Sequence, residues 1–436
     1  MQNVTLSDTS PESNPQAEPK LGTRSCPQCG ASIPIDPNFT TWCDSCGWNI
    51  QPLTPAKPAN PFEKLYLTLG IRLGKALKDQ LRQTEALRPH LTIERGLAFL
   101  LACLTYGLMV MVAGEGIWLI VTGWPRVMIV IFGLFLIAFA VILRPHFAKV
   151  PRDIVPRAQA PTLYGLVDRI AQALHAPRLD GIVIDRTYNA SYLQAGLMRK
   201  RILTVGMPYI AAMKGQELVA IIAHEMAHGV NDDPFRSLVV GGAVNVLFNW
   251  YGFLWSTVSS YRREMTIFIT LMRIIALIPQ AGGYALAHLL WRDCQRAEYL
   301  ADYLGAQVSG TDAAVAALAK SQLVTVCSLA LQHAALNSHR VDGSIFDEMQ
   351  ARVSAVPERE LERIHRALKM EQSRLDTTHP PTGFRLDLLE LHRCSTAIVT
   401  CTESEYQRIY SELQPQQNEI QAQLIDGYLS HLYAAG

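Results

Sequence analysis

The chain has 436 residues, which is enough for two or three domains. It carries 39 Lys and Arg residues against 38 Asp and Glu residues, so its net charge of +1 argues against a nucleic-acid binder held by bulk electrostatics, and no nucleic-acid partner is expected. Hydrophobic residues make up 49% of the sequence, which indicates membrane segments.

The N-terminal part divides into a polar tail and a cysteine-rich segment. Residues 1–20 show no signal peptide and predict a disordered tail. In residues 21–50, two C-x2-C pairs are separated by thirteen residues, and each pair is followed by Gly. Four thiolates at this spacing close a tetrahedral site, which predicts a zinc ribbon with one structural Zn²⁺. The ligands would be Cys26, Cys29, Cys43 and Cys46.

Two disulfides are the alternative for these cysteines, but thiol-rich ribbons belong to reducing compartments. A ribbon can bind nucleic acid, a protein or nothing. Few basic residues lie near this one, so nucleic acid is not expected and a protein partner is the interaction to consider.

A Pro-rich linker and a basic amphipathic segment follow the ribbon. Residues 51–61 contain four prolines and predict an extended, semi-rigid linker. In residues 62–95, apolar side chains recur at helical spacing among Lys and Arg residues, which suits a juxtamembrane helix on an anionic bilayer. A helix packed on the protein itself is equally compatible with this pattern. The apolar stripe consists of Phe62, Leu65, Leu69, Leu73, Leu77 and Leu81.

Residues 96–143 predict a transmembrane hairpin made of two apolar stretches, 96–114 and 127–143. Basic residues flank the hairpin on both outer sides, which places both flanks in the cytoplasm. A second pair of apolar stretches, 238–258 and 267–290, is compatible with two full crossings, with a hairpin that enters the bilayer partly, or with buried helices. We therefore expect an integral membrane protein with the lipid bilayer as a partner.

Short strands are expected between the two apolar hairpins. Gly181–Ile184 and Ile202–Val205 are rich in β-branched residues, and Asn189 lies between them. An edge strand here could bind an extended peptide by adding it to the sheet. The alternative is a plain hairpin without a ligand. After Gly310 the chain reads as helical and soluble.

The most informative motif is His224-Glu225-Met226-Ala227-His228, which reads H-E-x-x-H. The apolar run before it predicts a helix, on which positions i and i+4 share a face. Two imidazoles so placed can bind one zinc ion, and Glu225 can then take a proton from a metal-bound water. The alternative, a helix with two partly exposed histidines, leaves a costly polar cluster on an apolar helix.

A catalytic zinc ion usually has three protein ligands and one water. A third His at the usual extended spacing is absent, and Glu298 is the best candidate for the third ligand, ahead of Asp232, Asp233 and Asp293. Asp302 lies one helical turn after Glu298, where it could accept the N–H of a ligand imidazole. Two solvated acids on an amphipathic helix are the alternative.

His379 precedes two prolines that fix the backbone. If it faces the zinc ion, it could donate a hydrogen bond to a developing oxyanion. Taken alone, this pattern is more often an ordinary loop.

Together these motifs resemble the integral-membrane zinc metallopeptidases of the HtpX and CAAX prenyl endopeptidase group, which are gluzincins. The resemblance covers about residues 95–390 and rests on HEMAH, EYLAD at 298–302, Asn189-Ala190, and His379 with its prolines and Arg385. It implies catalytic zinc on His224, His228 and Glu298, Glu225 as general base, and Asp302 orienting a ligand His. It also implies that His379 stabilises the transition state, and that Asn189 and Arg385 contact substrate.

The expected fold class is mainly α with a small β-hairpin or sheet. It comprises a gluzincin-type metallopeptidase domain over residues 144–436, with transmembrane helices, and an N-terminal zinc ribbon. The expected function is zinc-dependent endopeptidase cleavage of membrane or membrane-associated polypeptides in protein quality control. The expected location is the bacterial inner membrane, with ribbon and active site on the cytoplasmic side. A non-catalytic membrane scaffold whose ribbon recruits proteins is the alternative, and a soluble-type peptidase with a buried apolar core is a third.

Overall fold

The computed structural model describes residues 22–52, 61–83, 93–142, 144, 148–196, 198–231, 237–259, 266–336, 343–374 and 379–435. The expected tail at 1–20, most of the linker at 51–61, and the competing ligands Asp232 and Asp233 lie outside these residues. The described part is mainly helical with two small sheets, as predicted.

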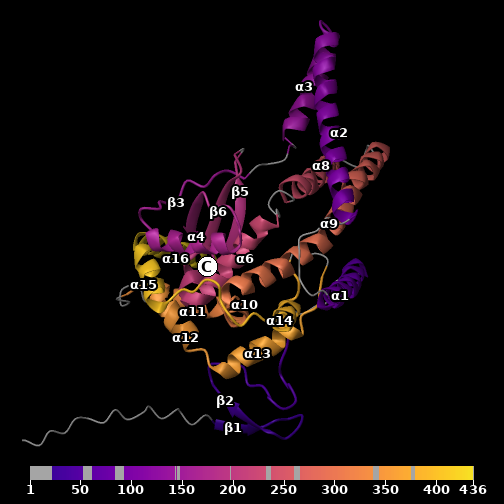
Figure 1. Cartoon of the computed structure of the whole chain (residues 1–436). Helices are drawn as coiled ribbons and strands as arrows, with labels where there is room; N and C mark the ends of the chain where they lie inside the picture. Colours follow the sequence, from indigo (N-terminus) through magenta and orange to yellow (C-terminus); the bar gives the residue numbers. More distant parts are fainter. Residues whose placement is uncertain are drawn as a thin grey trace, which may run out of the picture.

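The N-terminal segment folds as a two-stranded antiparallel sheet, β1 (Gly22–Ser25) with β2 (Ser32–Ile35), followed by turns. Gly30 and Gly47 both have φ near +75° directly after a C-x2-C pair, a backbone region that favours glycine. These turns bring the four cysteines together, and Figure 1 shows the segment at the opposite end of the molecule from helices α2 and α3.

The apolar stripe of helix α1 (Pro61–Arg82) is partly buried against the protein and partly exposed. Leu77 and Leu81 are buried against Tyr299 and Leu388, whereas Leu69 and Leu73 are exposed. The alternative of a helix packed on the protein therefore holds for the C-terminal half of α1. The helix ends at Arg82, earlier than the expected segment 62–95.

Helices α2 (Ile93–Gly123) and α3 (Val127–Ile142) form an apolar hairpin that projects from the rest of the chain (Figure 1). They approach closely at two glycines, since a Cβ on Gly116 would lie 2.7 Å from the carbonyl oxygen of Gly133. Small residues at such a crossing are typical of helix packing in membranes. Most other side chains of the hairpin are exposed and apolar.

Among the described residues, three helices are long and apolar enough to cross a membrane: Ile93–Gly123, Leu238–Trp255 and Ile269–Ser309. With its 16 residues, α3 is about 24 Å long and is shorter than a full span by itself. The bent pair α10 (Thr311–Lys320) and α11 (Val324–Leu336) would make a fourth candidate by composition, but its buried side chains belong to the main core. The protein is thus an integral membrane protein.

The second sheet has four strands in the order β3-β4-β6-β5. The two strands expected from the sequence, β4 and β6, pair in parallel, so the plain hairpin considered for them is wrong. The reason is an additional strand, β5, which returns antiparallel beside β6 and forms an edge. The strands are β3 (Ile154–Val155), β4 (Gly181–Asp185), β5 (Ala190–Ala195) and β6 (Lys200–Gly206).

Helices cover this sheet and form the main core with it. Leu166, Ile182, Leu203 and Ile222 from four different elements are fully buried there. The first three of these helices are α4 (Pro161–Ala173), α5 (Met207–Ala212) and α6 (Gly215–Val230). The core therefore fixes α6, the helix that carries the HEMAH motif, against the sheet.

The second apolar hairpin consists of α8 (Gly242–Ser259), after a π-helical turn at Ser237–Gly241, and α9 (Thr266–Ser309). Helix α9 has 44 residues and runs without interruption from the apolar hairpin into the body of the molecule (Figure 1). It lies against α6 over its C-terminal part. One helix thus links the membrane segment to the motif helix.

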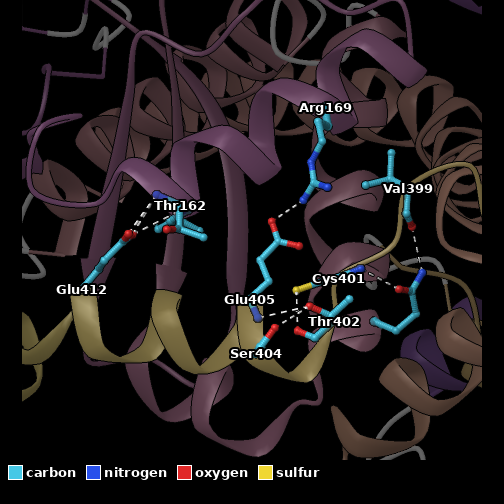
Figure 2. A network of polar contacts seen from close by, with 10 residues as sticks. Thr162, Arg169, Val399, Cys401, Thr402, Ser404, Glu405 and Glu412 are labelled. Atoms are coloured by element: carbon cyan, nitrogen blue, oxygen red, sulfur yellow. Dashed lines mark hydrogen bonds and ion pairs between the residues drawn. The ribbon is translucent and has the colours of Figure 1, made fainter.

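The remaining chain is helical, as predicted. Its C-terminal part makes polar contacts with α4 and α6 (Figure 2). The carboxylate of Glu412 accepts the backbone N–H groups of Thr162 and Leu163 at the start of α4, where it complements the helix dipole. Arg169 pairs with Glu405. The helices are α12 (Ile345–Ser354), α13 (Glu358–Lys369), α14 (Thr382–Leu391), α15 (Glu403–Glu412) and α16 (Gln414–Ala435).

Candidate active site

Helix α6 is anchored at its N-terminus, which sets the position of the motif three turns later. The Glu217 carboxylate accepts the backbone N–H of Lys214 at 2.7 Å and pairs with Lys320, also at 2.7 Å. Gln216 donates to the carbonyls of Ser309 and Val399. These contacts tie α6 to the end of α9 and to the C-terminal region.

Helix α9 crosses α6 closely enough to bring its acidic residues to the motif. The approach depends on Gly305, because a Cβ there would lie 3.3 Å from the backbone nitrogen of His224. One and two turns before this crossing, Asp302 and Glu298 are both buried. The alternative of two solvated acids is therefore excluded for this helix.

The structure brings His224, His228 and Glu298 into one group. Nε2 of His224 lies 3.7 Å from Oε2 of Glu298, and Nε2 of His228 lies 3.5 Å from Oε1. Tetrahedral ligands about 2.1 Å from a zinc ion are separated by about 3.4 Å, so these spacings fit a shared cation. Among the described residues, this is one of two groups that could hold a metal ion, and neither His379 nor Asp293 belongs to it.

The second group consists of the four cysteines. Sγ of Cys26 lies 3.7 Å from that of Cys46, and Sγ of Cys29 lies 3.6 Å from that of Cys43. Bonds of about 2.3 Å to a tetrahedral ion require about 3.8 Å between sulfurs, so this donor set fits zinc. The sulfurs are too far apart for disulfides, and all four cysteines are free.

Asp302, itself held by Arg385, lies beside the ring of His224. Nδ1 of His224 lies 3.0 Å from Oδ1 of Asp302, which directs Nε2 toward Glu298. Nε and Nη2 of Arg385 each donate to the Asp302 carboxylate at 2.7 Å. An imidazole whose Nδ1–H is held by a carboxylate presents the lone pair of Nε2 to a metal.

Glu225 lines a cavity of about 270 Å³ together with His224, His379 and Asn189. Burial raises the pKa of the Glu225 carboxyl above its ordinary value, although His224 and His228 act in the opposite direction. A carboxylate whose pKa is raised toward neutrality is a better proton acceptor for catalysis near pH 7.

His379 reaches the same cavity from the other side. Its Nδ1 lies 2.8 Å from Oε2 of Glu298, and the ring is 64% exposed. Pro380 and Pro381 behind it are buried, which fixes the backbone that carries the ring. An exposed imidazole on a fixed backbone beside the metal group can meet a bound substrate.

Asn189 lies one residue before the edge strand β5 and lines the cavity. Its carbonyl accepts the N–H of Gly206, which holds it at the end of the sheet. Tyr192 of β5 lies against α6, since a Cβ on Gly229 would be 2.8 Å from its ring. The edge strand therefore runs beside the second ligand, His228.

A model of peptidase family M48 matches residues 157–392, more than half of the chain. The chain belongs to peptidase family M48. Every residue of the His224 group, together with Asn189, Glu225, Asp302, His379 and Arg385, falls within the matched range, and the four cysteines fall outside it. The M48 protein is therefore a membrane metallopeptidase whose His224, His228 and Glu298 cluster fits the pattern of H-E-x-x-H plus a distant Glu.

Three relatives are each described as a protease HtpX homolog. The chain is 25% identical to that of Salinibacter ruber over 242 residues, which is 54% of this chain and 76% of the relative. Identity is 27% over 168 residues for Pyrococcus furiosus and 30% over 173 residues for Thermococcus sibiricus. The latter two matches each cover 37% of this chain, and 56% and 57% of the relatives. No solved structure matches the chain at a comparable level.

The sequence did not indicate two features of this M48 site. Tyr209 on α5 lines the cavity but belongs to no motif with a recognisable spacing. Arg385, which was expected to contact substrate, lines the cavity, and its buried guanidinium also engages Asp302 with two nitrogens. This geometry favours a role in positioning Asp302. The one sequence signal for this contact was Asp302, an acidic residue that requires a cationic partner when it is buried.

Proposed function

We propose that this M48 metallopeptidase is an endopeptidase that cleaves membrane or membrane-associated proteins as part of protein quality control. The observation that carries the proposal is the continuity of α9, which includes a membrane-span candidate and also Glu298 of the metal group. This continuity would place the metal group close to the bilayer, where polypeptides held in or near the membrane are the nearest substrates. The HtpX homologs that the chain resembles are described as proteases, which supports the same class of reaction.

The proposed residue roles follow the geometry of the cavity. His224, His228 and Glu298 would hold the catalytic zinc ion, which when bound would lower the pKa of a water molecule toward 7 and polarise the scissile carbonyl. Glu225 accepts a proton from the attacking water molecule and later passes it to the leaving amine. His379 donates a hydrogen bond to the developing oxyanion.

Asn189 and the edge strand β5 are proposed to hold the substrate. Strand β6 pairs with one side of β5, and among the strands that the structure describes none pairs with the other side. An extended peptide added there would run past His228 and into the cavity, with main-chain hydrogen bonds supplying affinity. Cleavage would then require a locally unfolded substrate segment.

We further propose that the ribbon holds a structural zinc ion and that ribbon and active site face the bacterial cytoplasm. Basic residues at the two ends of the apolar hairpin α2–α3, Arg95 in the first turn of α2 and Arg144, Arg152 and Arg157 after α3, support this orientation. Reduced thiols, which zinc binding needs, also favour the cytoplasmic side. Cysteine labelling of intact and opened cells, with a reporter cysteine in the 148–153 segment, tests the orientation.

The function is tested by comparing the membrane proteomes of cells with wild type and with the Glu225→Gln protein. Membrane proteins that accumulate only with Glu225→Gln, and fragments that disappear with it, would support the proposal. Purified wild type in detergent should also cleave itself when zinc is added, and a chelator should block this cleavage. Identical proteomes together with no self-cleavage would favour the non-catalytic scaffold, for which Glu225 has no evident use.

A further inference from the structure

The ribbon is packed against helix α13 of its own chain through Trp42. This side chain is 1% exposed, although the ribbon is too small to bury it alone. The guanidinium carbons of Arg359 and Arg366 lie 4.6 Å and 5.0 Å from the centre of its ring. Seven residues separate these arginines, so they project from the same face of α13, two turns apart. Each contact of this kind stabilises a docked aromatic ring.

Polar contacts fix the orientation of the ribbon on the same helix. Arg359 pairs with the carboxylate of Asp44 and donates to the carbonyl of Trp42. Nη1 of Arg366 donates to the carbonyl of Asp44 at 2.8 Å. Both docking residues of the ribbon thus adjoin Cys43, one of the four clustered cysteines. The conformation that α13 recognises depends on how Cys43 is held.

The opposite face of α13 leads to the active site. Ile364 and Leu368 belong to the main core. At the end of α13 the backbone touches the first turn of α14, since a Cβ on Gly383 would lie 2.7 Å from the carbonyl oxygen of Leu368. The carboxylate of Glu371 also accepts the backbone N–H of Thr382 at 3.2 Å. No side chain separates these two helix ends, so a shift of one is transmitted to the other.

The N-terminal part of α14 and the residues just before it face the metal group. His379 precedes this helix by three residues, and Arg385 lies within it. His379 contacts Glu298, and Arg385 holds Asp302. A rotation or slide of α14 would therefore move the exposed imidazole of His379 relative to a bound substrate. Arg385, held by two short hydrogen bonds, would resist such a movement more strongly than His379.

We propose that the metal-loaded ribbon is an internal brace that positions His379 through α13 and α14. Trp42, Asp44, Arg359 and Arg366 are positioning residues in this arrangement, and α13 is the partner of the ribbon. The inference rests on the proposed role of His379 in catalysis. It predicts that ribbon docking changes turnover more than substrate affinity, because the β5 edge lies on a different element.

The ribbon is one of two structures that support the segment between α13 and α14, so its loss should lower kcat only in part. Helix α1 holds the segment after α13 from another side, since a Cβ on Gly70 would lie 2.7 Å from the carbonyl oxygen of Ser373. Loss of ribbon docking should therefore loosen His379 without releasing it. Because misplacing a catalytic group by about 1 Å can cost about 100-fold in rate, we expect a fall of about tenfold in kcat.

The test uses the full-length protein in detergent and a charge exchange between ribbon and helix. Arg359→Asp should lower kcat about tenfold, leave KM unchanged and retain two zinc ions per chain by elemental analysis. The double variant Arg359→Asp with Asp44→Arg should recover part of kcat, because the ion pair is restored with reversed polarity while the contacts of Arg359 with Trp42 are not. Arg352→Ala is the matched control, since this arginine of α12 pairs with Glu348 of its own helix.

Hydrogen exchange supplies a readout that does not depend on activity. Amides of residues 379–391 should exchange faster in Arg359→Asp than in wild type, at an intermediate rate in the double variant, and at the wild-type rate in Arg352→Ala. Unchanged kcat and exchange in Arg359→Asp would overturn the inference, as would a loss that the double variant does not partly restore. If wild type itself cleaves nothing, the proposed function fails, while the exchange experiment still decides whether the ribbon restrains the His379 segment.

Discussion

Arg385 donates two hydrogen bonds of 2.7 Å to the carboxylate of Asp302, which lies 3.0 Å from Nδ1 of His224. The side chains of Arg385 and Asp302 are only 11% and 7% exposed. The pair is therefore a buried, bidentate support for a metal-binding imidazole. Substitution of Asp302 is expected to weaken zinc binding, whereas substitution of Arg385 is expected to destabilise the fold.

Asp302→Ala should weaken the binding of the catalytic zinc ion by about 10- to 100-fold, because His224 loses the acceptor that sets its tautomer and ring orientation. Zinc affinity measured by competition with a coloured chelator checks this. Asp293→Ala, a buried acid of the same helix outside the metal group, serves as the control. Wild-type affinity in Asp302→Ala would show that His224 is oriented by other contacts.

Arg385→Ala should destabilise the fold itself, by about 3–5 kcal/mol, because it leaves the buried Asp302 carboxylate without its cation. Arg385→Lys should be intermediate, since an ammonium keeps the charge but cannot form the two-pronged contact. Thermal unfolding of the two variants in the same detergent measures the difference. Equal stability of wild type and Arg385→Ala would contradict a buried ion pair at this position.

Glu225→Gln should keep both zinc ions and lose at least about 10²- to 10⁴-fold in kcat, because the metal ligands remain and the proton acceptor is gone. Cleavage of a denatured protein substrate, followed by gel, measures the rate. Zinc content is determined on the same sample. Cleavage at the wild-type rate would assign the general base to another residue.

Glu298→Ala should remove one zinc ion and leave the other, because only one of the two metal groups is changed. Elemental analysis of the purified variant should fall from two zinc ions per chain to one. Cys43→Ser should have the complementary effect, losing the ribbon ion and keeping the catalytic one. Full zinc content in Glu298→Ala would require a different third ligand.

His379→Ala should lower kcat by about 10²- to 10³-fold with little change in KM or zinc content, as expected for the loss of a hydrogen bond made mainly to the oxyanion. His379→Asn, which keeps a donor on a shorter side chain, should recover part of the rate. A variant that instead loses zinc would show that His379 acts on the metal group through Glu298, from which it is 2.8 Å away.

The metal groups could be predicted from the sequence because their spacing is local or nearly so. His224 and His228 share a helix face by periodicity, and each C-x2-C pair forms its own turn. Glu298 was found by its pairing with Asp302 one turn later. The helical class and two of the four strands of the larger sheet also followed from apolar patterning.

Long-range contacts could not be predicted in this way. The partner of Asp302 lies 83 residues away in Arg385, and the partner of Trp42 lies 317 residues away in Arg359. Arg359 stands in no motif, and Arg385 was assigned to the substrate through the resemblance and not to Asp302. An edge strand was expected in this region, but the residues of β5 and its antiparallel pairing with β6 could be assigned only from the structure.

The unbroken course of α9 also sets a height at which the protein can act. Between Arg273 and Arg292 this helix has no Asp, Glu, Lys or Arg, so its apolar part ends near Leu290. Glu298 follows eight residues later, which at 1.5 Å per residue is at most about 12 Å along the axis. A rigid helix of this length serves as a ruler. Under the proposed function, peptide bonds within a few residues of the lipid surface are the expected cleavage sites, and folded parts farther from the bilayer are expected to unfold before cleavage.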